Sequence, residues 1–194
     1  MKKILIIGGT GFLGFSVSKS LVKKYKIYSI SLSPPKKYRK HKKIKYLLAD
    51  ISKIKSIKKI KKHISDIKYV INFGGYVIHD NKRKVFETHY LGAKNLMNFY
   101  LRKKINFFLQ IGSSMEYGKT PSPQQEESIS KPTSDYGKAK LLATNYAKKL
   151  FKLHNFPAVV FRLYQIYGPH QDNNRLIPFI IEKCLNNESF PCSS

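Results

Sequence analysis

Residues 4–14 of this chain read ILIIGGTGFLG, an apolar run that passes into a segment with a glycine at every third position. Four consecutive aliphatic residues at 4–7 are typical of a buried strand in a parallel sheet. From Phe12 onward the apolar residues recur with helical spacing. Gly8, Gly11 and Gly14 therefore lie where a strand turns into a helix, and the stretch predicts the opening unit of an α/β fold.

The same alternation continues along the chain. Further strand-like runs are found at Ile27–Ile30, Tyr46–Leu48, Tyr69–Phe73, Phe107–Ile111 and Ala158–Leu163. Helical patterns are found at about 12–23, 53–64, 82–103, 135–154 and 175–187. Strands that alternate with helices favour a parallel sheet covered on both faces. We therefore expect a doubly wound, Rossmann-type sheet of about six strands.

The glycine-rich turn has the chemistry of a phosphate cradle. Glycine at position 8 permits a tight turn, at 11 a close approach of pyrophosphate, and at 14 close helix packing. The helix that begins near Phe12 offers free N–H groups and a positive dipole end to an anion. A Walker-type loop is excluded because no Gly-Lys-Ser/Thr follows. An ordinary glycine-rich turn is the structural alternative to a dinucleotide site.

Composition limits the class of protein. The 194 residues carry 37 Lys+Arg against 11 Asp+Glu, a formal net charge of +26. Such a charge favours polyanionic partners, but the lysines are spread over nearly every expected helix and loop, so we expect no nucleic-acid partner. Two cysteines, Cys184 and Cys192, do not make a disulfide framework, which indicates a cytoplasmic setting. The apolar run at 4–7 breaks too early for a signal peptide, and no run approaches the roughly 20 residues of a membrane span.

A tyrosine and a lysine with i,i+4 spacing, Tyr136 and Lys140, fall on one face of the expected helix 135–154. A free tyrosine has a pKa of about 10, and a nearby ammonium group lowers the pKa of a phenol. We therefore expect Tyr136 to act as an acid/base and Lys140 to lower its pKa. Alone, the spacing is common. The segment GSSMEYG at 112–118, directly after an expected strand, supplies hydroxyl groups upstream.

Taken together, these motifs resemble the extended short-chain dehydrogenases/reductases, the NAD-dependent epimerase/dehydratase family that modifies nucleotide sugars. The turn GGTGFLG, the segment SSMEYG, the helix start YGKAK and the segment RLYQIYGP at 162–169 carry the resemblance. The resemblance covers essentially the whole chain. It implies a Rossmann domain at 1–165 and only the start of a substrate domain at 166–194, because relatives continue further; the chain looks truncated.

The resemblance also implies site residues. The catalytic set is Ser113, Tyr136 and Lys140, and substrate contacts come from Ser113, Ser114 and Tyr136. Cofactor contacts are implied for Gly8, Thr10, Gly11, Phe12, Leu13, Gly14, Asp50, Ile51, Phe73, Gly74, Gly75, Tyr136 and Lys140. Asp50 matches the acidic residue that binds adenine, with a helix-capping or loop aspartate as the alternative. Strand-end capping is the alternative for the serines.

The cofactor is expected to be NADP or NAD. An NAD enzyme places a carboxylate after its second strand, whereas this chain has Ser31-Leu32-Ser33 there, followed by Lys36, Lys37 and Arg39. These cations suit a 2′-phosphate, so the sequence favours NADP. No metal is expected.

Four positions depart from the family pattern. His89 stands where relatives carry a helix asparagine that organises a proton relay, and Gln165 replaces another asparagine. Ser114 and Met115 stand where 4,6-dehydratases carry Asp-Glu, which disfavours dehydration. Arg162 is better explained as a structural ion-pair partner than as a site residue.

The sequence thus predicts an NAD(P)-dependent epimerase or reductase of a nucleotide-activated sugar. The alternative is a non-catalytic dinucleotide-binding fragment or regulatory protein without a complete substrate site, and a nucleic-acid-binding module ranks third. By analogy with the family, helices 82–103 and 135–154 form the contact of a homodimer.

Overall fold

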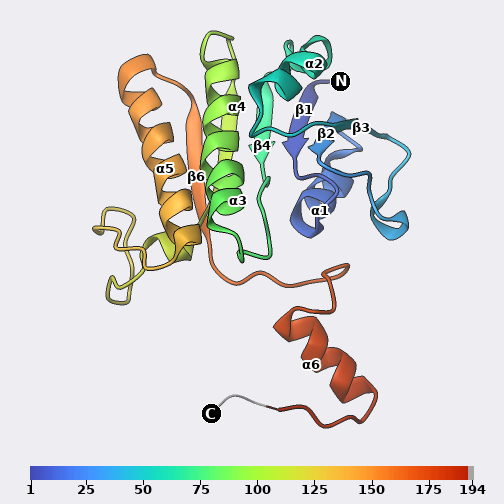
Figure 1. Cartoon of the computed structure of the whole chain (residues 1–194). Helices are drawn as coiled ribbons and strands as arrows, with labels where there is room; N and C mark the ends of the chain where they lie inside the picture. Colours follow the sequence, from blue (N-terminus) through green and yellow to red (C-terminus); the bar gives the residue numbers. More distant parts are fainter. Residues whose placement is uncertain (192–194) are drawn as a thin grey trace. The chain divides into compact units, whose positions relative to one another are not determined.

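The computed structural model describes residues 1–191. Its sheet has the strand order β3-β2-β1-β4-β5-β6, and every neighbouring pair is parallel (Figure 1). The strands are β1 (Lys3–Ile7), β2 (Lys26–Ser31), β3 (Ile44–Leu48), β4 (Tyr69–Asn72), β5 (Phe107–Ser113) and β6 (Ala158–Leu163). The expected six-stranded Rossmann-type sheet is confirmed.

The helices follow the predicted alternation, with one difference. The α-helices are α1 (Phe12–Leu21), α2 (Ile54–Ile64), α3 (Lys82–Phe86), α4 (Gly92–Leu101), α5 (Asp135–His154) and α6 (Leu176–Leu185); short 3₁₀ turns are η1 (Lys37–Arg39) and η3 (Ser114–Glu116). The helix expected at 82–103 is interrupted by a π-helical turn, η2 (Glu87–Leu91). Such turns are often found at functional sites, and this one contains the buried side chain of His89.

Alternating residues of β1 point into two hydrophobic layers. Leu5 and Ile7 pack with apolar residues of α2, α4 and α5, among them Leu96 of α4. Ile4 and Ile6 pack on the other face, with residues of α1 and the strands beside it. Because both faces of the central strand are covered, its near-continuous apolar sequence is explained.

The chain divides into two compact units, Met1–Tyr164 and Gln165–Ser194. The sheet and helices α1–α5 belong to the first unit and α6 to the second. Cys184 is an exposed free thiol, and Cys192 lies outside the described residues. Within residues 1–191, no helix has the length and apolarity that a membrane span requires.

Candidate functional site

The glycine turn joins β1 to α1 at the point where the chain reverses direction across the sheet, between β1 and β4. In folds with this strand order, ligands bind at that switch point, outside the carboxyl ends of the strands. Gly8 has a φ of +74°, and a Cβ there would come within 3.0 Å of the Phe73 carbonyl. A Cβ on Gly14 would lie 2.2 Å from the Gly8 carbonyl oxygen. Both glycines are required by backbone packing alone.

Gly11 is different, because its surroundings leave room. A Cβ there would meet only the Gly8 carbonyl oxygen, at 3.2 Å, so nothing in the described chain fills the space in front of it. Gly11 is the N-cap of α1, no side chain caps that helix, and its first turn has no acidic residue. The helix N-terminus therefore presents backbone N–H groups without a side-chain acceptor, which fits an anionic pyrophosphate.

The remaining predicted residues of the turn lie at the start of α1 and beside the end of β2. Phe12 and Leu13 begin α1 and are half-buried. The Thr10 amide donates to the Ser31 hydroxyl at 3.3 Å, which links the turn to the end of β2.

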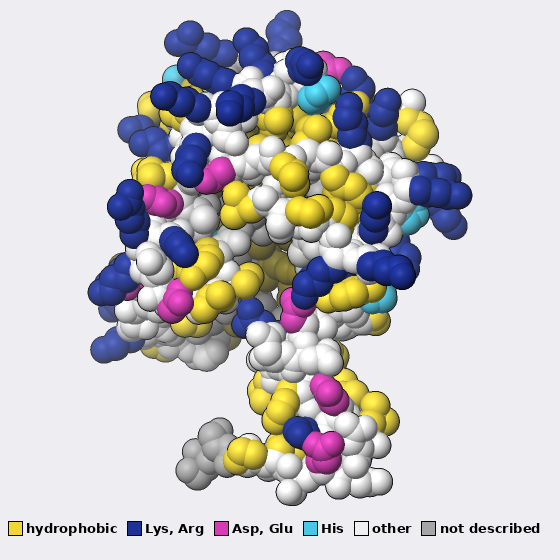
Figure 2. Space-filling model, turned by 45° about the vertical axis from the view of Figure 1, so that its right-hand side comes forward, with side chains coloured by type: hydrophobic (Ala, Val, Ile, Leu, Met, Phe, Trp, Pro, Cys, Tyr) yellow, Lys and Arg dark blue, Asp and Glu magenta, His cyan; other side chains and the backbone are white. Residues whose placement is uncertain are grey.

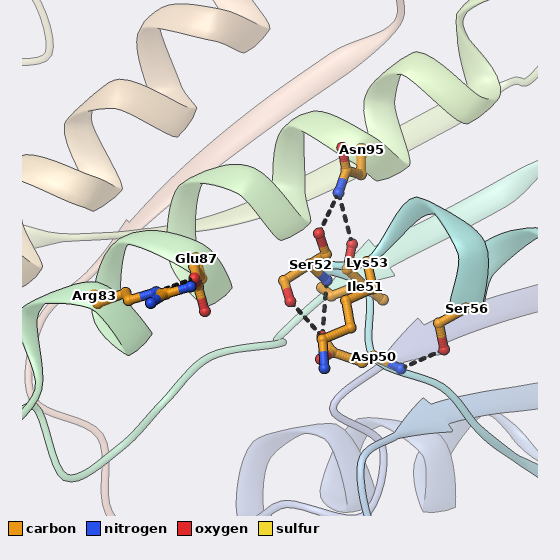
Figure 3. A network of polar contacts seen from close by, with 8 residues as sticks. All are labelled: Asp50, Ile51, Ser52, Lys53, Ser56, Arg83, Glu87 and Asn95. Atoms are coloured by element: carbon orange, nitrogen blue, oxygen red, sulfur yellow. Dashed lines mark hydrogen bonds and ion pairs between the residues drawn. The ribbon is translucent and has the colours of Figure 1, made fainter.

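Asp50 and Ile51 follow β3 in a loop that is held by hydrogen bonds (Figure 3). The Asp50 Oδ1 accepts from the Ser52 amide at 2.9 Å and from the Ser52 hydroxyl at 2.6 Å. Asn95 of α4 donates its Nδ2 to the carbonyls of Ile51 and Ser52, at 3.0 and 2.8 Å. Asp50 is thus a loop aspartate and does not cap α2, whose N-cap is Lys53 without a side-chain hydrogen bond. Its role toward adenine stays a prediction.

Phe73, Gly74 and Gly75 follow β4 beside the glycine turn. The Gly74 amide donates to the Asn72 Oδ1 at 3.0 Å, and a Cβ on Gly74 would lie 2.7 Å from the Ile7 side chain. A Cβ on Gly75 would lie 2.3 Å from the His89 ring. Gly74 and Gly75 thus let the loop pass close to both the sheet and the π-helical turn.

Ser113 and Tyr136 meet at the carboxyl end of β5. Ser113 is the N-cap of η3, where its Oγ accepts from the Met115 amide at 3.2 Å, so the capping alternative is realised for this serine. Tyr136 lies in the first turn of α5, where the Ser134 hydroxyl caps the helix by accepting from the Gly137 amide at 3.0 Å. Burial raises the pKa of Tyr136, while its hydrogen bond with the Ser113 side chain opposes that rise.

Lys140 lies one helical turn after Tyr136 in α5, and its side chain is buried beside the phenol ring. Its Nζ donates to the Ile111 carbonyl at 2.7 Å and lies 5.7 Å from the centre of the Tyr136 ring. Burial lowers the pKa of Lys140 to about 8. The net pKa of Tyr136 is raised, because desolvation of the phenol outweighs the hydrogen bond that lowers its pKa. The expected lowering of the Tyr136 pKa by Lys140 stays a prediction.

Two histidine rings pack against Tyr136. His79 stacks on it with ring centres 4.1 Å apart, and His89 meets its edge at 4.9 Å. The His89 Nε2 lies 3.2 Å from the Tyr76 amide and 3.1 Å from its carbonyl, whereas the buried Nδ1 has no hydrogen-bond partner among residues 1–191. Burial lowers the pKa of His89 to about 3. A neutral His89 ring thus joins the glycine loop after β4 to the proposed acid/base.

A buried amide pair joins the two halves of the site through the sheet. The Asn72 Nδ2 donates to the Gln110 Oε1 at 2.8 Å, and the Gln110 Nε2 donates to the Ile111 carbonyl at 3.0 Å. That carbonyl also accepts from Lys140. A continuous polar path therefore leads from the loop at Gly74 to Lys140, inside otherwise apolar strands.

Arg162 on β6 is an ion-pair partner, as predicted. Its Nε lies 3.0 Å from the Glu116 Oε2, and the Glu116 side chain is fully buried. Ser114 and Met115 form the 3₁₀ turn before Glu116, where Ser114 is half-buried and Met115 exposed. Gln165 begins the second unit.

Lysine and arginine side chains are spread across the face in Figure 2, with few acidic side chains between them. This distribution resembles a solvated basic coat rather than a single patch. No cluster of His, Cys, Asp and Glu suited to a metal ion is found in the part of the chain that the structure describes.

A parallel sheet of order 3-2-1-4-5-6 with a glycine turn at its switch point defines a Rossmann-type α/β protein. Residues 4–193 match the model of the family described as "NAD dependent epimerase/dehydratase family". The chain belongs to this family.

Curated relatives agree with this assignment. The chain is 26% identical to a mouse (Mus musculus) protein named dTDP-D-glucose 4,6-dehydratase, over 96% of this chain and 56% of that protein. It is 27% identical to a Dictyostelium discoideum protein of the same name, over 97% and 49%. The chain thus spans about half the length of these relatives.

Solved structures share the fold. A UDP-N-acetylglucosamine 4-epimerase from Methanobrevibacter ruminantium superposes with a TM-score of 0.86 at 24% identity, over 97% of this chain and 64% of that one. A Bacillus cereus UDP-glucuronic acid 4-epimerase in complex with NAD superposes with a TM-score of 0.82 at 21% identity, over 96% and 63%.

Sequence reasoning missed two parts of this site. Glu116 was noted only as a letter in a motif, although its full burial places it at the centre of a network. His79 lies in a loop without a periodic pattern, and its stacking on Tyr136 depends on the fold of that loop.

Proposed function

We propose that this chain carries the dinucleotide-binding and proton-transfer half of an NAD(P)-dependent epimerase or reductase that acts on a nucleotide-activated sugar. The observation that carries the proposal is the meeting of Ser113, Tyr136 and Lys140 at the carboxyl end of β5, next to an open glycine cradle. Membership of an NAD-dependent family and the names of its relatives support it.

The cradle residues fit a dinucleotide. The open space at Gly11 and the uncapped N-terminus of α1 would receive the pyrophosphate. Asp50 and Ile51 would lie toward the adenine, and Phe73 to Gly75 along the nucleotide. For the ribose next to adenine, the exposed Lys36 and Lys37 favour NADP over NAD, whereas Arg39, the third cation expected there, is buried.

When bound there, the nicotinamide supplies hydride exchange with a sugar carbon. The Tyr136 hydroxyl holds the proton that is exchanged with the sugar oxygen, and Ser113 donates a hydrogen bond to that oxygen. Because burial raises the Tyr136 pKa, the phenol keeps its proton at neutral pH, which suits protonation of a carbonyl oxygen. Lys140, fixed on the Ile111 carbonyl, places a cation beside the phenol ring.

Epimerisation or reduction fits the chain better than 4,6-dehydration. Elimination of water needs an acid and a base near the sugar. By resemblance, these would stand at positions 114 and 115, where this chain has serine and an exposed methionine. We extend the proposal to a homodimer through α4 and α5, by analogy with the family.

The test is turnover of a panel of nucleotide sugars with NAD(P)(H), for the wild-type chain and for Tyr136→Phe. We expect loss of turnover in this variant. A matched control is Tyr146→Phe, because Tyr146 lies further along the same helix and pairs with Asn98 instead. Inversion at a sugar carbon identifies an epimerase and net oxidation of NAD(P)H a reductase. Unchanged turnover in Tyr136→Phe removes the proposal, and binding without turnover supports the non-catalytic alternative.

A further inference from the structure

Glu116 is a buried carboxylate that touches three elements of the site. Its side chain has no exposed surface. Its Oε1 accepts from the Ser113 amide at 2.9 Å, and its Oε2 accepts from the Thr144 hydroxyl at 2.8 Å and from the Arg162 Nε at 3.0 Å. One carboxylate thus connects the end of β5, the middle of α5 and the edge strand β6.

The surrounding residues are built to receive this side chain. A Cβ on Gly112 would lie 2.5 Å from the Glu116 Oε1, so glycine makes room for it. The Arg162 guanidinium lies over the Tyr117 ring at 4.5 Å and donates to the Glu126 carbonyl at 3.3 Å. A buried ion pair adds little net stability even with good geometry and extra hydrogen bonds. Its position beside the site therefore suggests a role other than stability.

The position of Glu116 relative to Ser113 suggests what that role is. The two residues form a reciprocal capping box, in which the Ser113 hydroxyl caps η3 and the Glu116 side chain accepts from the Ser113 amide. This fixes Ser113 in an extended conformation, with φ −154° and ψ 147°. The start of α5 packs against η3, because a Cβ on Gly137, next to Tyr136, would lie 2.4 Å from the Met115 carbonyl oxygen. There the Ser113 side chain lowers the Tyr136 pKa by hydrogen bonding, against the rise caused by burial.

We propose that Glu116, held by Arg162, is a positioning residue that keeps the Ser113 hydroxyl against Tyr136. That this positioning serves catalysis rests on the proposed function, whereas the contacts of Glu116 are independent of it. Glu116 also acts on Tyr136 through space, because its charge raises the Tyr136 pKa, although less strongly than the Ser113 hydrogen bond lowers it. The two influences have opposite signs, and this separates them experimentally.

The experiment measures the Tyr136 pKa by ¹⁹F NMR in the full 194-residue chain, with fluorotyrosine incorporated at position 136. Fluorination lowers the phenol pKa, which brings the titration into a pH range in which the chain stays folded. In Glu116→Ala we expect the pKa to rise, because Ser113 is released. In the Ser113→Ala background the same substitution should lower the pKa, because only the charge is lost. Equal shifts in both backgrounds would overturn the proposal.

A conservative variant covers the case in which Glu116→Ala does not fold. Glu116→Gln keeps an oxygen for the Ser113 amide and loses the charge, so the Tyr136 pKa should fall; a rise would contradict the positioning role. Glu127→Gln, a change at an exposed carboxylate, is the matched control and should leave the pKa unchanged. Since no cofactor or substrate is present in the titration, its outcome is independent of the turnover test.

Discussion

Replacing Gly14 by alanine tests whether the β1–α1 turn is packed as the structure has it. The added Cβ would lie 2.2 Å from the Gly8 carbonyl oxygen, 2.7 Å from the Gly8 carbonyl carbon and 2.8 Å from the Gly9 Cα. All three are backbone atoms, which cannot rotate away as a side chain would. The helix must therefore move off the turn.

The size of the effect follows from two opposing contributions. Overpacking of this kind costs about 1–3 kcal/mol, and the higher helix propensity of alanine offsets up to about 1 kcal/mol. We expect a net loss of about 1–2 kcal/mol in the free energy of unfolding. For a chain of this size that corresponds to a fall in Tm of about 3–6 °C.

The matched control is Gly11→Ala in the same turn. Gly11 has a φ of −79°, which alanine adopts without strain, and its Cβ would meet only one atom, at 3.2 Å. The main cost is the poorer N-cap, so the stability should change by less than about 1 kcal/mol. Thermal and urea unfolding followed by circular dichroism measures both variants. Equal stability of Gly14→Ala and wild type would refute the packing of the turn.

Three further predictions concern buried titratable groups. The His89 pKa is lowered to about 3, so the folded chain resists protonation of this ring, and up to about 5 kcal/mol of stability is lost as pH falls from 6.5 toward 3. Acid unfolding of His89→Asn should lack this slope, and an unchanged slope would contradict the prediction. Lys140→Met removes a cation whose pKa burial lowers to about 8, so the free energy of unfolding at pH 7 should rise by about 1–3 kcal/mol. This gain in stability should disappear as pH rises from 8 to 10.5. Urea titrations at pH 7 and 10.5 measure it, and a loss of stability at pH 7 would count against the prediction. Arg162→Met leaves the Glu116 carboxylate buried and unpaired, which should lower the free energy of unfolding by about 3–5 kcal/mol. Adding Glu116→Met should restore much of that stability. A double variant as unstable as the single one would disprove the pairing.

The fold was predictable because its signals are local and repeated. Apolar runs of strand length alternate with helical patterns, and the strands they predicted are those of the sheet. The π-helical turn at 87–91 was not predictable, because no residue type marks it and it depends on packing His89 against Gly75 and Tyr136.

The site was predictable where backbone geometry requires a particular residue, as at Gly8 and Gly14. The direction in which the pKa of Tyr136 is shifted was not predictable from the sequence. The i,i+4 spacing predicts a cation near the phenol, but it carries no information on burial, and burial decides the net direction of the Tyr136 pKa. The role of Glu116 depends on Thr144 and Arg162, which are far away in sequence.

The most direct test of the account is a fluorescence titration of the 194-residue chain with NADPH and, separately, NADH, alongside Gly11→Ala. The account predicts saturable binding to the wild-type chain, tighter for NADPH, and at least a tenfold loss in Gly11→Ala, because its methyl group fills the space left for the pyrophosphate. Absence of binding to either nucleotide, or equal binding by Gly11→Ala, would contradict the proposed cradle.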